Sequence, residues 1–309
     1  MKQRGVILIS ALVITAMAAG VAAALFYDTG LLARRAMANF GLEQALQIGQ
    51  GAEALAAEVL REDTNQTDTP SDSWAQAVDP VEVQDGVVLE ARLTDEAARF
   101  NLNSLVNADG EHNESAVRVF RRRLELVELE PRWADMVADW IDPDTLPAPD
   151  GAEDGLYLSQ TPPHRAANLA ISSTTELLQM PGFTRQMYDA LAPHVTALPA
   201  NVRAINVCTA GGVVLDALFA LHENDQKHVE YSTLTQEEMD ERRTGECYPR
   251  RATLTSGQQA MQQFTAERSS WFRLETWVNV GSAQFALYSL MQRDGSGRVQ
   301  AVTRSLGHE

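Results

Sequence analysis

The chain has 309 residues, enough for one large domain or two of ordinary size, and 45% of them are hydrophobic. Its 42 acidic residues outnumber the 25 lysines and arginines, which gives a net charge of −17. Such a surface repels phosphate backbones, so the composition excludes nucleic acid as a partner and favours divalent cations or basic protein surfaces.

The amino-terminal residues predict a membrane helix. A run without charged residues covers positions 6–26, about 21 residues, and as a helix it would span roughly 30 Å, the hydrocarbon thickness of a bilayer. Lys2, Arg4 and the terminal amine precede the run, so we expect a cytoplasmic amino terminus and the rest of the chain on the opposite side. The run is too long, and its leader too short, for an ordinary secretory signal.

Gly5 stands directly before this run and Val6 follows it. The junction resembles the processing site of type IV prepilins and of the pseudopilins of type II secretion. In those proteins a dedicated peptidase cuts after the glycine, and the new amino terminus is methylated. An uncleaved signal anchor fits the same residues, so both interpretations stay open on this evidence.

Helical character continues beyond the membrane run. Residues 31–61 contain no proline, and apolar side chains recur at three- and four-residue spacing. We expect one long helix with its first half in lipid and an apolar stripe of its second half on a soluble domain. The stripe would comprise Leu42, Leu46, Ala52, Leu55, Ala56, Val59 and Leu60. Residues 62–80 are polar and predict a surface loop, which Trp74 would hold against the domain.

Strand patterns flank a large helical block. Asp85-Gly86 lies between two β-branched runs and predicts a hairpin, and the alternating segments 271–280, 283–293 and 299–306 predict an antiparallel meander. Between them, residues 115–130 are amphipathic, with Val117, Phe120, Leu124 and Val127 on one side. Further helical patterns cover 131–141, 164–169, 174–180, 184–195 and 210–221.

These elements predict an α+β fold. The two groups of strands would pair into one antiparallel sheet, the long helix would cover one face, and a large all-α domain would be inserted between the strands. The predicted divisions are a leader at 1–5, a transmembrane half-helix at 6–26, a first part at 27–110, the inserted domain at 111–245 and the carboxyl-terminal strands at 246–309.

Several local strings carry a family resemblance, and together they span nearly the whole chain. They are RFNLNSL at 99–105, DWIDPD at 139–144, GAEDGLY at 151–157, Ala167-Asn168 and INVCTA at 205–210. With the leader, the helix and the insertion, they resemble the K-type minor pseudopilins of type II secretion systems. The resemblance implies a pilin-like fold without enzymatic activity, anchored once in the bacterial inner membrane with its bulk in the periplasm.

The resemblance also implies partners and a position. The chain would be processed by the prepilin peptidase, contact the inner-membrane assembly platform and join I- and J-type minor pseudopilins at the pseudopilus tip, near the secretin or exported substrates. Most pilins carry glutamate at the fifth mature position, where this chain has Ser10. A carboxylate in lipid needs a positive partner, and a subunit with no neighbour above it lacks that partner. Ser10 therefore fits a terminal subunit, although an anchor unrelated to pilins would lack the glutamate as well.

An acidic cluster predicts a metal site. Carboxylate-rich loops favour calcium, which takes six to eight oxygen ligands. Leu146 and Pro147 occupy positions where an EF-hand needs a ligand and a glycine, so we expect an irregular, structural calcium loop, which the resemblance also implies. A solvated acidic loop is the alternative. The candidate ligands are Asp139, Asp142, Asp144, Asp150, Glu153 and Asp154.

Cys208 and Cys247 are the two cysteines of the chain. In an oxidising compartment they predict one disulfide closing a loop of about 40 residues, with two buried thiols as the alternative. No catalytic motif emerges, and His112 is expected in an exposed polar context. Two other functions stay open at this point: a minor pilin of a type IV pilus, and a signal-anchored periplasmic enzyme or calcium-binding module that does not polymerise.

Overall fold

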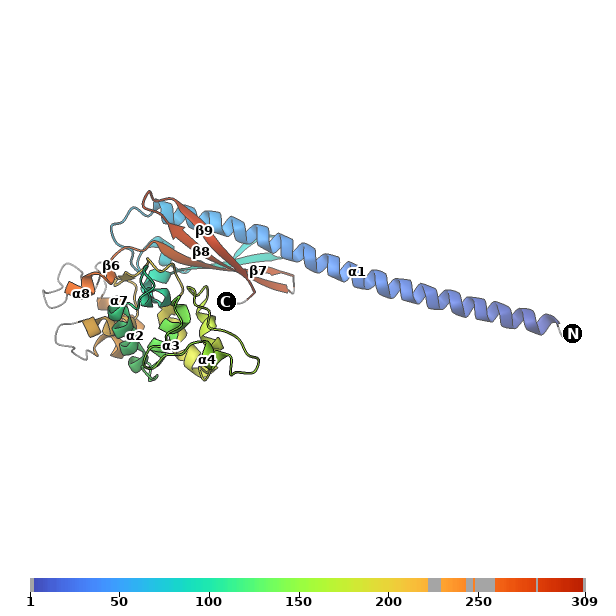
Figure 1. Cartoon of the computed structure of the whole chain (residues 1–309). Coiled ribbons are helices and arrows are strands. Elements are labelled where there is room, and N and C mark those ends of the chain that lie inside the picture. The colour runs from blue at the N-terminus through green and yellow to red at the C-terminus, as the bar shows by residue number, and fades with distance from the viewer. Residues whose placement is uncertain (1–2, 222–228, 243–246, 248–258, 282, 308–309) are drawn as a thin grey trace.

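The computed structural model describes residues 3–221, 229–242, 247, 259–281 and 283–307. Figure 1 shows a long helix that projects from a body in which one face of a sheet lies against the helix and a group of shorter helices lies beyond the other. This arrangement confirms the predicted α+β fold with a long amino-terminal helix on an antiparallel sheet.

Helix α1 runs without interruption over Gln3–Glu62, 60 residues and about 90 Å at helical rise. Residues 9–40 are exposed along their whole length, and the contacts with the sheet begin at Gly41. The prediction of a single helix with a free first half and a packed second half is therefore confirmed.

The buried face of α1 differs from the predicted stripe. Gly41, Ala45 and Gly49 are buried at four-residue spacing, whereas Leu55 is 68% exposed and Val59 is 38% exposed. The small residues bring the helix backbone close to the sheet, since a Cβ on Gly49 would lie 2.7 Å from Leu287 Cδ2. This close approach fixes the rotation of α1 and turns Leu55 and Val59 outward.

The sheet has the strand order β1-β2-β7-β8-β9, and every neighbouring pair is antiparallel. Gly86, at φ +71°, closes the predicted β1–β2 hairpin. Strand β2 pairs along its length with β7, from Val87 opposite Val280 to Asp95 opposite Phe272. Segments on the two sides of the helical block thus form one sheet, as predicted. Its strands are β1 Val81–Gln84, β2 Val87–Asp95, β7 Trp271–Val280, β8 Ala283–Arg293 and β9 Val299–Leu306.

One face of the sheet supplies the core beneath α1. Alternate residues of β7 are buried there, among them Phe272, Leu274 and Val278, because successive strand side chains point to opposite faces. Trp74, in the short 3₁₀ turn Ser73–Ala75, is buried with its ring 5.1 Å from the ring of Phe272. Trp74 holds the 62–80 loop against the sheet, as predicted.

The inserted block has its own core, and α2 is amphipathic as predicted, with Val117, Phe120 and Leu124 buried. Most elements are single turns. The helices are α2 Glu114–Leu126, α3 Trp133–Ile141, α4 Asp154–Tyr157, α5 Arg185–Leu191, α6 Gly212–Leu218, α7 Gln236–Arg242 and α8 Gln259–Gln262. The 3₁₀ turns are η2 Glu96–Ala98, η3 Leu102–Leu105, η4 Thr174–Gln179, η5 Ala192–His194, η6 Phe219–Leu221 and η7 Tyr231–Thr233.

The block departs from the predictions in three respects. It is not entirely helical, because β3 Phe100–Asn101 pairs with β4 Val195–Thr196 and β5 Ile205–Asn206 pairs with β6 Thr265–Ala266, both in parallel. Its core reaches beyond the predicted limits of 111 and 245, since Phe100 and Phe264 belong to it. Residues 164–169 are not helical, because the Ala166 and Asn168 amides bond to Asp154 and to the Trp140 carbonyl.

Candidate metal centre and assembly helix

The predicted acidic cluster lies where helix α3 ends. Asp139 belongs to the last turn of α3, Asp142 follows its end directly, and Glu153 precedes α4. One carboxylate oxygen each of Asp142, Asp144 and Glu153 lie within 4.8 Å of one another. Pro143 ends the helix at Ile141, because a proline disfavours helical backbone at the residue before it, here Asp142. The loop between α3 and α4 then returns Glu153 to Asp142.

Burial leaves part of this cluster without partners. Asp142 and Glu153 are 1% and 8% exposed, and among the described residues Asp142 Oδ1 and both carboxylate oxygens of Glu153 accept no hydrogen bond. Burial, followed by repulsion from Asp142 and Asp139, raises the pKa of Glu153 to about 7. Buried carboxylates of this kind need a counter-charge. The donor set consists of hard oxygen atoms, which is the kind that calcium prefers.

Asp139 and His112 stand beside the cluster. His112 Nε2 lies 2.7 Å from Asp142 Oδ2 and 3.6 Å from Asp139 Oδ1. Asp139 also accepts the Ala148 amide at 3.0 Å, and burial raises the pKa of its carboxyl to about 6. The prediction of a merely exposed His112 is therefore wrong. His112 precedes Asp142 by 30 residues, and packing of the block brings the two together.

Four of the six predicted carboxylates gather here, and two do not. Asp150 is exposed and belongs to no acidic group among the described residues, and Asp154 Oδ1 accepts the Ala166 amide at 3.1 Å. Asn168 was not predicted as a ligand. Its side-chain nitrogen donates to the Asp144 carbonyl at 2.7 Å, while its buried Oδ1 has no partner in the described part of the chain. This oxygen is a further candidate ligand for a metal ion.

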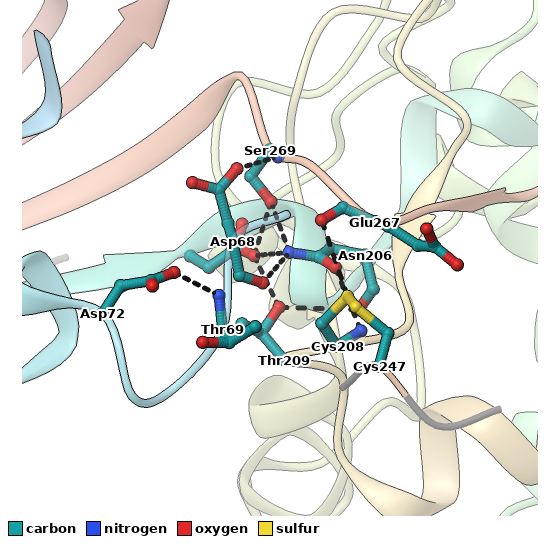
Figure 2. The surroundings of a disulfide bond; sticks show 10 residues. Asp68, Thr69, Asp72, Asn206, Cys208, Thr209, Cys247, Glu267 and Ser269 are labelled. Carbon is teal, nitrogen blue, oxygen red and sulfur yellow. Dashed lines mark hydrogen bonds between the residues drawn. A yellow bond between two sulfur atoms is a disulfide. The ribbon is translucent and has the colours of Figure 1, made fainter. Parts of the chain in front are cut away.

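A buried polar network joins the helical block to the sheet. The Asn206 side-chain amide donates to the Asp68 carbonyl, to Asp95 Oδ2 at 2.9 Å and to the Ser269 hydroxyl at 3.0 Å. Figure 2 shows Asn206 at the centre of these bonds, beside the disulfide between Cys208 and Cys247, whose Cα atoms are 4.3 Å apart. Because Asp95 ends β2 and Ser269 precedes β7, the network fixes the block at the two points where the chain leaves and re-enters the sheet.

A second acidic group, Asp63, Asp68 and Asp72, adjoins this network. Arg293 already compensates part of its charge, since its guanidinium is ion-paired with both Asp63 and Asp68. The buried Asp68 also accepts the Ser269 amide at 2.6 Å. An arginine therefore holds the place that a cation would need, and this group is a structural part of the junction.

The predicted processing residues lie in α1. Gly5 and Val6 belong to its first two turns, and Ser10 is exposed on its surface. Within the described residues, one helix, α1, is long and apolar enough to cross a membrane. A single amino-terminal helix of this kind fits a single-pass anchor.

The fold and its free apolar helix define a pilin-like membrane-anchored protein with an inserted helical block. Residues 98–200 match the family model "Type II secretion system (T2SS), protein K". The chain is 30% identical to the type II secretion system protein K of Pseudomonas aeruginosa, over 99% of this chain and 93% of that protein. It is also 30% identical to the type II secretion system protein K of Klebsiella pneumoniae, over 95% of this chain and 94% of that protein. The chain therefore belongs to the type II secretion system protein K family.

A solved structure shares the fold. A chain of the GspK-GspI-GspJ complex from the enterotoxigenic Escherichia coli type 2 secretion system matches with a TM-score of 0.73 and 22% identity, covering 89% of this chain and all of that one. Family membership confirms the resemblance to K-type pseudopilins, and it favours a secretion system over the alternative of a type IV pilus.

Proposed function

We propose that this protein is a minor pseudopilin that caps the tip of the type II secretion pseudopilus and nucleates its assembly with I- and J-type minor pseudopilins. One observation carries the proposal: α1 is exposed over residues 9–40, while the helical block lies beyond the opposite face of the sheet. The helix is thus free to pack among other helices, and the block would obstruct a subunit stacked above it. The related complex contains three such proteins together.

The amino terminus supplies the assembly chemistry. The prepilin peptidase would cut between Gly5 and Val6, and the new amine would be methylated. Ser10 carries no charge into the membrane, so this subunit does not need the amine of a neighbour above it. The chain would lie in the inner membrane with its amino terminus in the cytoplasm and its body in the periplasm, in contact with the assembly platform and close to the secretin or exported substrates.

Two measurements test this proposal. Mass spectrometry of the protein from membranes should show a methylated Val6 terminus, whereas an intact Met1 would indicate a plain anchor. Co-expression with the I- and J-type proteins of the same system should yield a stoichiometric complex after purification. A processed chain that never enters such a complex would contradict the proposed role at the tip.

We also propose a structural calcium ion in the α3–α4 loop, held by carboxylate oxygens of Asp142, Asp144 and Glu153, with Asp139 close by. The support is the buried, partnerless oxygens of Asp142 and Glu153. A bound calcium ion would neutralise these carboxylates and so stabilise the loop that connects the two helices.

The calcium site is tested by melting temperature. Asp142→Ala with Glu153→Ala should lower the melting temperature in calcium and abolish the response to a chelator that the parent shows. Asp150→Ala, at an exposed carboxylate outside the cluster, is the matched control and should keep the response of the parent. A parent that is indifferent to chelator, or a double variant that still responds, would refute the proposal.

A further inference from the structure

Helix α2 carries a buried arginine that has no acidic partner. Arg123 is 0% exposed in the core of the helical block, and among the described residues it forms no ion pair. Its Nη2 donates to the Val214 carbonyl at 3.4 Å, while Nε and Nη1 donate to no acceptor there. An ordinary N–H···O bond measures about 2.9–3.0 Å, so the carbonyl holds this guanidinium only weakly.

The other buried arginine of the described chain shows what is lacking here. Arg293 is 4% exposed, and its guanidinium is ion-paired with both Asp63 and Asp68. Burial lowers the pKa of Arg123 to about 9, so this group still carries its proton at neutral pH. A charge taken out of water persists in a protein interior when an opposite charge or a bound ion accompanies it. Arg123 therefore needs an anion.

The neighbouring ionisable groups add positive charge. The charges of Arg123 and Arg99 both act on His194 and lower its pKa, so the three basic side chains share one region of the block. The carboxylate bound by Arg99 is Glu96, at 3.1 Å, and Arg273 binds the same carboxylate at 3.1 Å. One acid thus serves two arginines, and Arg123 has none of its own.

An aromatic ring covers one face of the guanidinium. The central carbon of Arg123 lies 4.7 Å from the centre of the Phe100 ring, which stacks on Phe120 at 5.4 Å. The ring attracts the cation, but it has no net charge and cannot neutralise it. The N–H groups of a guanidinium lie in its plane, away from the ring. An anion would therefore approach Nε and Nη1 from the edge of the plane.

Full burial determines the kind of anion. A carboxylate on another protein chain cannot reach a side chain that is 0% exposed, whereas a compact ion can be enclosed as the block folds. We infer that Arg123 binds a small monovalent anion of the halide class, with Nε and Nη1 as the donors, in the core of the helical block. This ion would supply the counter-charge that the described residues do not, and so stabilise the block. It requires neither the metal ion nor the role at the pseudopilus tip.

The melting temperature of the full chain in a non-ionic detergent tests this site. Sodium chloride is compared with sodium methanesulfonate, whose anion is larger, at equal ionic strength and equal calcium. Chloride at ten times its dissociation constant should raise the melting temperature of the parent by about 3–6 °C. Arg123→Met keeps an unbranched side chain but removes the charge, and it should abolish this difference. Arg118→Met, at an exposed arginine of the same helix, is the control and should respond like the parent.

Bromide locates the ion independently of any variant, and so decides the question even if Arg123→Met does not fold. Crystals of the parent grown in bromide should show an anomalous scattering peak within hydrogen-bond distance of Arg123 Nε or Nη1. A parent that melts at the same temperature in both salts, or bromide crystals without this peak, would overturn the site. A chloride response that persists in Arg123→Met would show an adventitious ion only, and it would overturn the site as well.

Discussion

Glu53 of α1 and Arg304 of β9 form a two-pronged ion pair beneath the long helix. Arg304 Nε lies 2.8 Å from Glu53 Oε1, and Nη2 lies 2.7 Å from Oε2. The Glu53 carboxylate is buried and also accepts the Ser289 hydroxyl. Together with the glycine contacts, this pair fixes which side of α1 faces the sheet, and Leu55 is therefore turned outward.

Glu53→Ala should lower the free energy of unfolding by about 1–3 kcal/mol, because it removes charge-assisted hydrogen bonds and leaves the Ser289 hydroxyl buried without its acceptor. Urea unfolding of the full chain in detergent measures this. The control is Glu58→Ala, which removes an exposed ion pair with Arg61 and should leave the midpoint unchanged. If the parent, Glu53→Ala and Glu58→Ala unfold at the same urea concentration, the buried ion pair does not hold α1 in place.

Replacing Gly49 and Gly51 of α1 with alanine should change the stability of the protein in opposite directions. Gly49→Ala places a Cβ 2.7 Å from Leu287 Cδ2, so the helix and the sheet must separate or Leu287 must move. Gly51→Ala meets nothing within 4 Å and should stabilise the helix by about 0.5–1 kcal/mol. Thermal unfolding should therefore rank Gly51→Ala above the parent and Gly49→Ala below it. The reverse order would contradict the close packing described for this helix.

Gly151 should be essential to the proposed calcium loop. A Cβ at this position would lie 2.0 Å from Asp139 Oδ2, so Gly151→Ala must displace either the loop or the carboxylate. Calcium titration calorimetry should show at least tenfold weaker binding. Gly155→Ala, four residues on, has open space around it and should bind like the parent. Unchanged affinity in Gly151→Ala would exclude this loop from the metal site.

His194 should make stability depend on pH. Burial, together with the nearby charges of Arg123 and Arg99, lowers the pKa of His194 from 6.5 to about 4. Between these values the unfolded chain binds a proton that the folded chain does not. The free energy of unfolding should therefore fall as the pH falls from 6.5 to 4, by up to about 3 kcal/mol. His194→Gln should flatten this part of the stability profile relative to the parent, and parallel profiles would contradict the assignment.

The sequence predicted correctly those elements whose structure depends on the local pattern of residues. The strands β7, β8 and β9 have the predicted limits, because alternating apolar residues and glycine-containing turns specify an antiparallel meander without reference to distant segments. The buried face of α1 was predicted only in part: Ala52 and Leu60 are buried as expected, whereas Leu55 and Val59 are exposed. The predicted stripe did not include Gly41 and Gly49, which are buried where the helix contacts the sheet.

The helical block and its site depend on tertiary contacts that no local pattern reports. Residues 164–169 have a helical pattern, but they form no helix. The Ala166 amide donates to Asp154 instead, and the Asn168 amide donates to the Trp140 carbonyl. The same packing places His112 and Asn168 beside acids that are distant in sequence. Carboxylates that are close in sequence could be predicted to form a cluster, while the partners contributed by other elements could not.

The position of this chain in the fibre tests the central claim most directly. Pseudopili can be assembled with one epitope-tagged copy of this protein and imaged after gold labelling. The proposed role predicts one label per fibre, at a single end. Labels distributed along the shaft, or a second copy crosslinked above the first, would contradict the claim that this protein caps the tip.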